Sequence, residues 1–365
     1  MTIIELHQAE QQSRNTHLVP LTQRRLAAAK ASYTVRHVDF NDVKSLLIGE
    51  LQPRAGDLVL ARIARLGQHK RVELGSGRRA HLHINDEVLL CYGARYAPDQ
   101  YEALVPDRLE PCDMVAAGGV AAHCRHRHAS IKPPTRIDPI GLLADHQGRR
   151  INCGQYGLAW QIDTQAKPPV YGVLGTMMNA GKTTSAAMLV RGLRQSGLRT
   201  GAAKVTGTGA GCDRWVLSDA GADMVLDFTD MGVPSTYGLS AEQVEQLFKD
   251  LVAHLSNAGM EAIVVEIADG LFQREAAELL RSDYFRSRCE GVIFAASDAL
   301  GAQAGIRHLQ ASNYQVLAAS GTMTASPLAI REASQVLDVP VLTATELASG
   351  DWQPATSKMI HGQRA

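Results

Sequence analysis

The residues with the clearest chemical meaning form one short segment, Gly175-Thr-Met-Met-Asn-Ala-Gly181-Lys182-Thr183-Thr184. An apolar run at 171–174 precedes it and a helix-prone stretch follows it. At such a strand–loop–helix junction the backbone N–H groups and the positive end of the helix dipole attract phosphate. Lys182 adds a charge for the β- and γ-phosphates of a nucleotide, and the Thr183 hydroxyl suits Mg²⁺. We expect the nucleotide to contact Gly175, Thr176, Asn179, Ala180, Gly181, Lys182, Thr183 and Thr184.

Two carboxylates are candidates for the same magnesium site. Asp213 follows a weak apolar run at 201–205, and Glu266 ends a strong one at 262–265. The carboxyl ends of parallel strands face the ligand crevice of an open sheet. We therefore expect Asp213 and Glu266 to join Thr183 around Mg²⁺. The plainer alternatives are a helix N-cap for Asp213 and a merely structural strand-end charge for Glu266.

A second lysine ends the run at 201–205. Lys204 is placed to hold a phosphoryl oxygen or a substrate carboxylate, and Thr208 to donate a hydrogen bond to the same group. A solvated strand-end lysine is the alternative. We expect Lys182, Lys204 and Thr208 to be the catalytic residues. The loop residues Asp227, Asp230, Ser235 and Thr236 either line a substrate pocket or serve ordinary turn chemistry.

One further cluster has metal-ligand residue types, His123-Cys124-Arg125-His126-Arg127-His128. Its His and Cys side chains permit Zn²⁺, but the two arginines repel a cation and no second ligand pair has finger spacing. A solvated basic loop is the favoured interpretation, and contact with an anionic substrate is a third possibility.

The elements that position these residues follow from hydrophobic patterning. From 170 onward, apolar runs alternate with helical stretches, which predicts a doubly wound, mostly parallel α/β sheet. The strands are expected at 170–174, 201–205, 223–228, 262–265, 291–296, 315–319 and 339–342, and the helices at 182–195, 241–255, 274–281, 301–311 and 327–337.

The N-terminal half has a different character. Short β-prone runs separated by turn signals at 52–110 predict a small β-barrel or sandwich, while 111–168 look irregular. Lys167-Pro-Pro169 has the composition of a linker. We expect a helical extension at 1–37, a β-rich domain with an irregular segment at 38–166, and a nucleotide-binding α/β domain at 167–365.

Composition narrows the function. Among 365 residues, 37 basic and 37 acidic side chains balance, so nothing global points to nucleic acid or a membrane surface. The apolar runs are too short to span a bilayer, and the N-terminus has no apolar signal core. Six dispersed cysteines suit reduced thiols in the cytoplasm.

The phosphate loop and three other segments resemble the dethiobiotin synthetase family and its relatives, the cobyrinate-type amide synthetases. The loop has the Gly-Thr-x₄-Gly-Lys-Thr spacing of that family. Segment 203–209 is similar to its Lys-Pro-Val-x-(Ser/Thr)-Gly stretch, with Val205 in place of proline. Asp213 follows where the family has a metal-associated aspartate. Segment 264–271 is similar to its Val-Glu-Gly-Ala-Gly-Gly stretch, with Ile267 and Asp269 in place of glycines. The likeness covers about 170–345.

The resemblance implies ATP, Mg²⁺ and a base pocket near Gly321-Thr322 and 340–343. An Asn-Lys-x-Asp guanine motif is also absent from the sequence. The implied reaction is phosphorylation of an oxyanion on a small-molecule substrate, followed by attack of an amine. We further expect a homo-oligomer, specifically a dimer. Two alternatives stay open: a small-molecule kinase, and a regulatory ATPase that controls a protein partner. Thr176 stands where partitioning ATPases carry an extra lysine, which argues against that last group.

Overall fold

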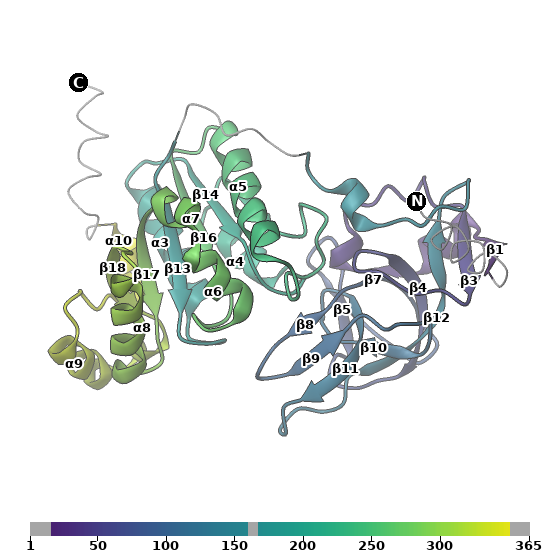
Figure 1. The fold of residues 1–365 in the computed structure, drawn as a ribbon, viewed down its shortest axis with the longest axis horizontal. Coiled ribbons are helices and arrows are strands. Elements are labelled where there is room, and N and C mark those ends of the chain that lie inside the picture. Colours follow the sequence, from purple (N-terminus) through teal and green to yellow (C-terminus); the bar gives the residue numbers. More distant parts are fainter. Residues whose placement is uncertain (1–15, 160–166, 351–365) are drawn as a thin grey trace, which may run out of the picture. The chain divides into compact units, whose positions relative to one another are not determined.

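The chain is divided into two compact units. The computed structural model describes residues 16–159 and 167–350 (Figure 1). The first unit contains the described residues up to 159 together with two later segments, 208–211 and 228–237. The second unit contains the other described residues from 167 onward. The two later segments fall within the range expected for the nucleotide-binding domain, yet they pack with the β-rich unit.

The first unit is built mainly from short strands. It also holds the helix α2 (Gln23–Ala28) and the 3₁₀ turns η2 (Tyr33–Val35) and η3 (Cys153–Tyr156). Its strands are β1 (Thr16–Pro20), β2 (Lys30–Ala31), β3 (Ser45–Gly49), β4 (Leu58–Arg65), β5 (Arg71–Glu73), β6 (Arg79–His81), β7 (Glu87–Tyr92), β8 (Arg95–Tyr96), β9 (Tyr101–Leu104), β10 (Cys112–Met114), β11 (Val120–Arg127) and β12 (Thr135–Ala144).

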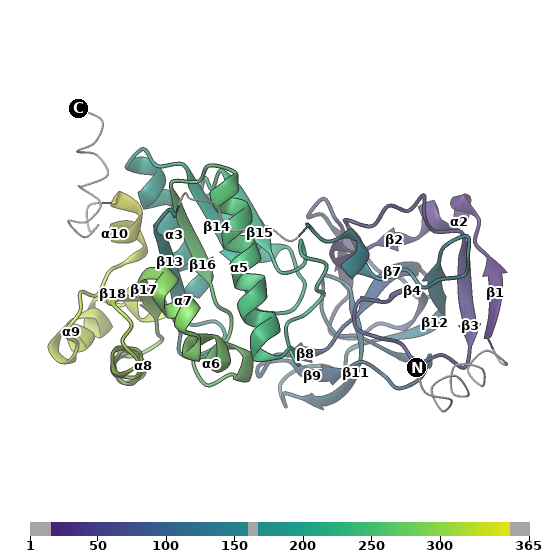
Figure 2. The same ribbon diagram turned by 45° about the horizontal axis from the view of Figure 1, so that its top comes forward.

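Five of these strands close into a ring. The order is β12-β4-β7-β11-β10, and β10 pairs with both β11 and β12. Buried side chains such as Val59, Leu90 and Ile137 fill its core. Strands β3 and β1 extend the sheet from β12 (Figure 2). The predicted β-rich domain with barrel-like character is confirmed.

Two expectations for the N-terminal half were wrong. Residues 112–114, 120–127 and 135–144, expected within an irregular segment, form β10, β11 and β12. Glycine and proline there mark turns and bulges, since Gly119 has φ +95° and the β12–β4 register shifts between Pro139 and Gly141. The extension expected to be helical contains strand β1, which pairs with β3, and the short helix α2. Residues 1–15 of that extension lie outside the described residues.

The second unit is a six-stranded parallel sheet. Its strands are β13 (Val170–Gly175), β14 (Thr200–Lys204), β15 (Met224–Asp227), β16 (Ala262–Glu266), β17 (Cys289–Ala295) and β18 (Val316–Ser320), in the order β15-β14-β16-β13-β17-β18. Strand β13 lies between β16 and β17. The run at 339–342 forms only a bridge from Val341 to Ala319, because Pro340 has no N–H to extend a ladder.

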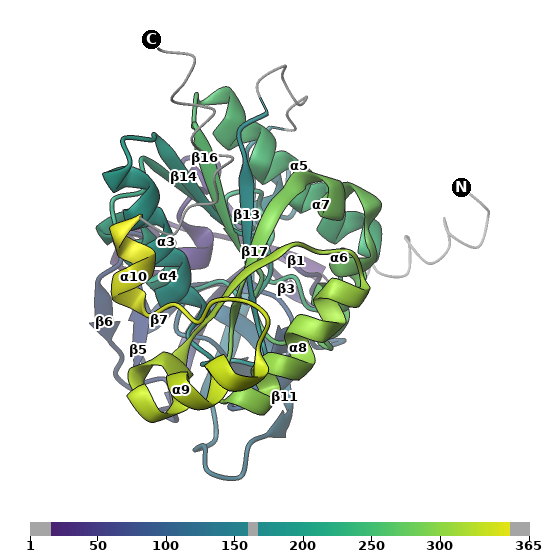
Figure 3. The ribbon, with the colours of Figure 1, turned by 90° about the vertical axis from the view of Figure 1, so that its left-hand side faces the viewer.

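Helices cover both faces of this sheet. They are α3 (Lys182–Gln195), α4 (Cys212–Asp219), α5 (Ala241–Asn257), α6 (Arg274–Arg281), α7 (Asp283–Arg288), α8 (Ala299–Ala311), α9 (Pro327–Val336) and α10 (Ala344–Ser349). Figure 3 shows α3, α4 and α10 on one side of the strands, and α5 to α8 on the other. The doubly wound parallel α/β sheet is confirmed. No helix in the described part of the chain is long and apolar enough to cross a membrane.

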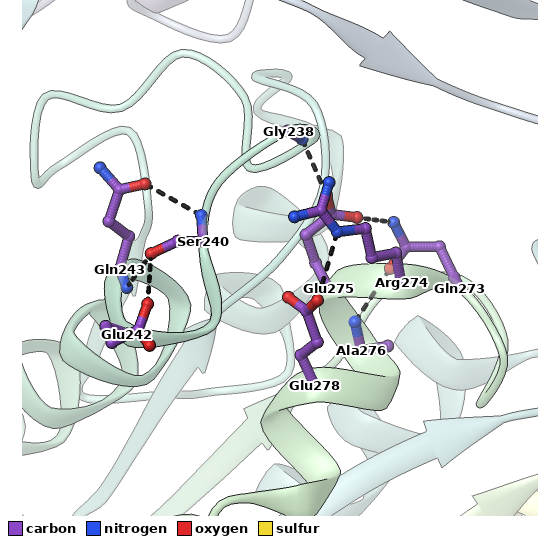
Figure 4. A network of polar contacts seen from close by, with 9 residues as sticks. All are labelled: Gly238, Ser240, Glu242, Gln243, Gln273, Arg274, Glu275, Ala276 and Glu278. Carbon is purple, nitrogen blue, oxygen red and sulfur yellow. Dashed lines mark hydrogen bonds and ion pairs between the residues drawn. The ribbon is translucent and has the colours of Figure 1, made fainter.

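Helix starts in this unit are fixed by side-chain caps. Ser240 and Gln243 form a reciprocal capping box at α5, and Gln273 caps α6 (Figure 4). Glu275, fully buried in the first turn of α6, accepts a hydrogen bond of 2.8 Å from the Gly238 N–H. That bond ties the segment entering α5 to the start of α6.

Candidate functional site

The phosphate loop joins β13 to α3, as its sequence predicts. Asn179 and Gly181 have φ values of +61° and +96°, so the loop turns through left-handed conformations just before α3 begins. The Thr176 N–H donates to the Ala295 carbonyl at 3.0 Å, and the Thr322 N–H donates to the Ala180 carbonyl at 2.9 Å. Backbone at the end of β17 and just after β18 therefore fixes the loop by hydrogen bonds.

Lys182 is folded back over this loop. Its residue is only 6% exposed, and its Nζ donates to the Met177 carbonyl at 2.7 Å. Burial lowers the pKa of Lys182, because a desolvated ammonium lacks the stabilisation that water gives it. A phosphate group bound in the loop would supply the missing negative charge.

Thr183 brings the two candidate carboxylates together. Its Oγ1 lies 3.2 Å from Asp213 Oδ1 and 3.1 Å from Glu266 Oε1. Lys204 Nζ is paired with Asp213 Oδ2, and Lys204 is the direct register partner of Glu266 on the neighbouring strand. Four of the predicted site residues thus form one cluster at the carboxyl ends of β14 and β16, beside the start of α3.

The charges in this cluster respond to burial and to one another. Burial raises the pKa of Glu266, which is 2% exposed. Burial acts to lower the pKa of Lys204, but Asp213 and Glu266 raise it above its ordinary value, so this lysine stays cationic. Burial alone would raise the pKa of Asp213, yet the Lys204 ammonium brings it below the usual value.

The donor set fits a magnesium ion. Glu266 Oε2 is buried without a hydrogen-bond partner among the described residues, which is costly for a carboxylate oxygen. A hydroxyl oxygen and two carboxylates are the hard donors that Mg²⁺ prefers, and Thr183 lies directly after the phosphate-loop lysine. A metal ion in this cluster would satisfy the Glu266 oxygen.

Other predicted residues lie elsewhere or play smaller parts. Thr208 belongs to the first unit, where it forms a bridge with Ser235. Thr184 is exposed on the first turn of α3. Asp269, which sequence comparison marked only as a replacement for glycine, has φ +63° and acts to raise the pKa of Lys182. Its position three residues after Glu266 is the feature of the sequence that could have predicted its place near Lys182.

The His/Cys cluster gathers no metal-ligand set. His126 Nδ1 lies 2.5 Å from Glu102 Oε2 on β9, and His128 Nδ1 lies 2.8 Å from Ser130 Oγ. Within residues 16–159 and 167–350, no group of three or more His, Cys, Asp or Glu side chains is arranged to hold a metal ion. The candidate magnesium site has two side chains of these types, Asp213 and Glu266, and its third donor is the Thr183 hydroxyl.

The second unit is thus a doubly wound α/β domain with a phosphate loop between β13 and α3. Comparison with models of known protein families finds no match, and comparison with curated proteins finds none either. Among solved structures, the signal recognition particle receptor FtsY from Elizabethkingia anophelis is 15% identical with a TM-score of 0.33, covering 52% of this chain and 67% of that chain.

Signal recognition particle 54 kDa protein from Aeropyrum pernix K1, in complex with GDP, is 17% identical with a TM-score of 0.35. That match covers 55% of this chain and 48% of the other. FtsY from Mycoplasma mycoides is 15% identical with a TM-score of 0.33, over 54% of this chain and 72% of the other. No comparison supports the narrower resemblance to dethiobiotin synthetases.

Proposed function

We propose that this chain is a Mg-ATP-dependent enzyme that transfers the γ-phosphoryl group to an oxyanion on a small molecule. One observation carries the proposal: Thr183, Asp213 and Glu266 converge beside the phosphate loop, and a buried Glu266 oxygen there has no partner among the described residues. This arrangement matches the needs of phosphoryl transfer, which depends mainly on positioning and on neutralising phosphate charge.

Each residue then has a distinct role. Lys182 binds the β- and γ-phosphates, and the backbone of 175–181 surrounds them. Thr183, Asp213 and Glu266 hold Mg²⁺, which supplies positive charge to the phosphate oxygens when bound. Lys204 binds the attacking oxyanion, because its raised pKa keeps it cationic at neutral pH.

The narrower proposal concerns the acceptor. A carboxylate-like group, activated as its phosphate and then attacked by an amine, would give an amide or a closed ring. The Lys204–Asp213 ion pair supports it, since a metal ion that took up the Asp213 oxygens would leave the Lys204 ammonium to pair with an anionic substrate. A cytoplasmic homodimer and a base pocket near Gly321-Thr322 and 340–343 belong to the same proposal.

A regulatory ATPase is the second candidate. The observation that favours it is the packing of 208–211 and 228–237, which follow β14 and β15, into the first unit. A conformational change on nucleotide binding at those strand ends would then alter the β-rich unit and change its affinity for a protein partner.

Product analysis separates these possibilities. Purified protein is incubated with Mg-ATP or Mg-GTP and a metabolite panel, with Lys182→Ala as the inactive control. We expect ATP cleavage that depends on one metabolite and releases ADP, phosphate and a joined or ring-closed product. A stable phosphorylated metabolite would instead identify a kinase. Phosphate release that no metabolite stimulates would favour the regulatory ATPase.

A further inference from the structure

The first unit includes two loops that follow strands of the parallel sheet along the chain. Segment 208–211 follows β14, and segment 228–237 follows β15. The loops are joined to each other, since Thr208 bridges Ser235 and the Gly209 N–H donates to the Pro234 carbonyl at 2.9 Å. Their conformations are therefore set within the β-rich unit.

Glu73, at the end of β5, fixes the first of these loops. It is 1% exposed, and its Oε2 accepts a 3.0 Å hydrogen bond from the Gly211 N–H. Helix α4 begins at the next residue, and Asp213 lies in its first turn. A carboxylate that accepts a backbone N–H at a helix start stabilises that start by hydrogen bonding and by the helix dipole. Glu73 thus holds Gly211, the residue before α4 and two positions before Asp213.

Arg36 fixes the second loop. Its guanidinium carbon lies 3.9 Å from the centroid of the Tyr33 ring, and its side chain is 9% exposed. Two of its nitrogens donate to Thr229 Oγ1 at 2.6 Å and to Asp230 Oδ1 at 2.5 Å. The loop begins directly after Asp227, which is the register partner of Lys204 on the adjacent strand. Arg36 therefore anchors the chain that continues from this strand end.

The packing leaves these loops little room to move alone. A methyl group at Gly118 would lie 2.0 Å from the Gly209 carbonyl oxygen, and one at Gly232 would lie 2.6 Å from the Cys153 carbonyl oxygen. Close-packed backbone of this kind shifts only together with its surroundings. Any displacement of the loops requires the first unit to adjust with them.

We infer that Glu73 and Arg36 are positioning residues for the phosphoryl-transfer site. Glu73 acts through the start of α4 on Asp213, and Arg36 acts through loop 228–237 on the strand end beside Lys204. The inference rests on the proposed function for its effect on turnover, but its structural part stands independently. Loosening either anchor then lowers turnover more than nucleotide affinity.

The test uses the full-length protein and two readouts. Glu73→Ala removes the acceptor, and Glu73→Gln restores an amide oxygen for the Gly211 N–H. Arg36→Lys keeps the charge but loses the two-pronged contact. Glu50→Gln, an exposed carboxylate of the same unit, is the matched control. The first readout is amide hydrogen exchange over 212–219 without nucleotide; the second is kcat and the affinity for Mg-ATP.

We expect Glu73→Ala to speed exchange over 212–219 and to lower kcat by about tenfold or more, while ATP affinity changes by less than about threefold. Glu73→Gln should recover most of both effects, Arg36→Lys should lower kcat, and Glu50→Gln should match the wild type. Unchanged exchange and kcat in Glu73→Ala, or an equal loss of kcat and affinity, would overturn the inference. If Glu73→Ala does not fold, Arg36→Lys with wild-type kcat would overturn it. A wild-type protein that binds no nucleotide contradicts the proposed function, whereas the exchange result still decides the structural part.

Discussion

Lys182, the proposed phosphate-binding side chain, lies in an environment that would favour an anionic partner. It is buried, its ammonium bonds to the Met177 carbonyl, and burial lowers its pKa. A charged group in that state gains more from a phosphate partner than a solvated lysine would, because hydrogen bonds between charged groups strengthen away from water.

Replacing this lysine should therefore weaken nucleotide binding without unfolding the protein. We predict that Lys182→Ala weakens Mg-ATP binding by about a hundredfold or more. Lys249→Ala, which removes an ion pair with Glu245 and a cation–π contact with the Tyr284 ring, should leave affinity unchanged. Isothermal titration calorimetry measures both. Equal affinity in the two variants would remove Lys182 from the site.

His69 gives a pH dependence to the first unit. Burial, assisted by the nearby Arg95 charge, lowers the pKa of His69 to about 4. The folded state therefore binds fewer protons than the unfolded state between about pH 6.5 and pH 4. Above this window His69 does not reduce the free energy of unfolding. As pH decreases through the window the free energy of unfolding falls, and the loss approaches roughly 3 kcal/mol at the lower end.

We predict that His69→Asn flattens this pH dependence. Urea unfolding midpoints at pH 7 and pH 5 are compared for the wild type, His69→Asn and His83→Asn, an exposed histidine of the same unit. The wild type and the control should lose stability together on acidification, and His69→Asn should lose less. A parallel loss in all three proteins would show that His69 does not carry the effect.

At the scale of single residues, the sequence predicts a role only where a local motif or a predicted strand end marks the residue. The Gly-Lys-Thr spacing predicts the phosphate loop. Glu266, which ends an apolar run, and Asp213, which follows one, are candidates for the same site on that ground. Glu73 has no such signal, because 138 residues separate it from Gly211 and its only distinction is a contact made on folding. Thr208 shows the converse, since its place next to β14 suggested the site while its packing assigns it to the first unit.

Among the elements, the phosphate loop packs closely against the backbone that follows β18. Gly321 has φ +100°, and a methyl group there would lie 2.4 Å from the Ala180 carbonyl oxygen and 2.6 Å from the Ala296 nitrogen. Gly197, just past the end of α3, has φ +85° but open space around it. Both glycines have a left-handed backbone, but only at Gly321 would an added methyl group collide with neighbouring atoms.

Alanine at these positions separates conformational strain from displacement of the loop. We predict that Gly197→Ala costs about 1 kcal/mol of unfolding free energy, from the left-handed backbone alone. Gly321→Ala should cost about 3 kcal/mol and also weaken nucleotide binding, because Ala180 must move. Chemical denaturation and calorimetry report the two effects. Equal costs with unchanged affinity would contradict this account.

The parallel sheet was easier to predict than the β-rich unit for a physical reason. Buried parallel strands are continuous apolar runs, and the helices between them are long enough to show their own periodicity. Strands β10, β11 and β12 instead carry polar residues, glycines and prolines at turns and bulges, so their pattern resembles a loop. Their pairing depends on closure of the ring, which is a property of distant residues.

At the scale of the whole molecule, the division at 165–169 stays a prediction, and the two later segments qualify it. We predict that a fragment of residues 167–365 binds Mg-ATP but turns it over about tenfold more slowly than the full chain, since 208–211 and 228–237 lose their packing partners. Supplying residues 1–166 separately should restore part of the activity. A fragment with full turnover would show that the first unit is dispensable.

The same two segments impose an order on synthesis. The β-rich unit ends its main stretch at residue 159, but its last segment ends at 237, which is 78 residues later (237 − 159). A domain emerging from the ribosome ordinarily folds once its own chain is free. Here the N-terminal unit is complete only after residue 237 has been synthesised. The intervening chain contains β13, α3, β14, α4 and β15, which must therefore leave the ribosome first. Its last backbone pairings close only when half of the parallel sheet has been made, so a nascent chain halted before residue 237 leaves both units incomplete.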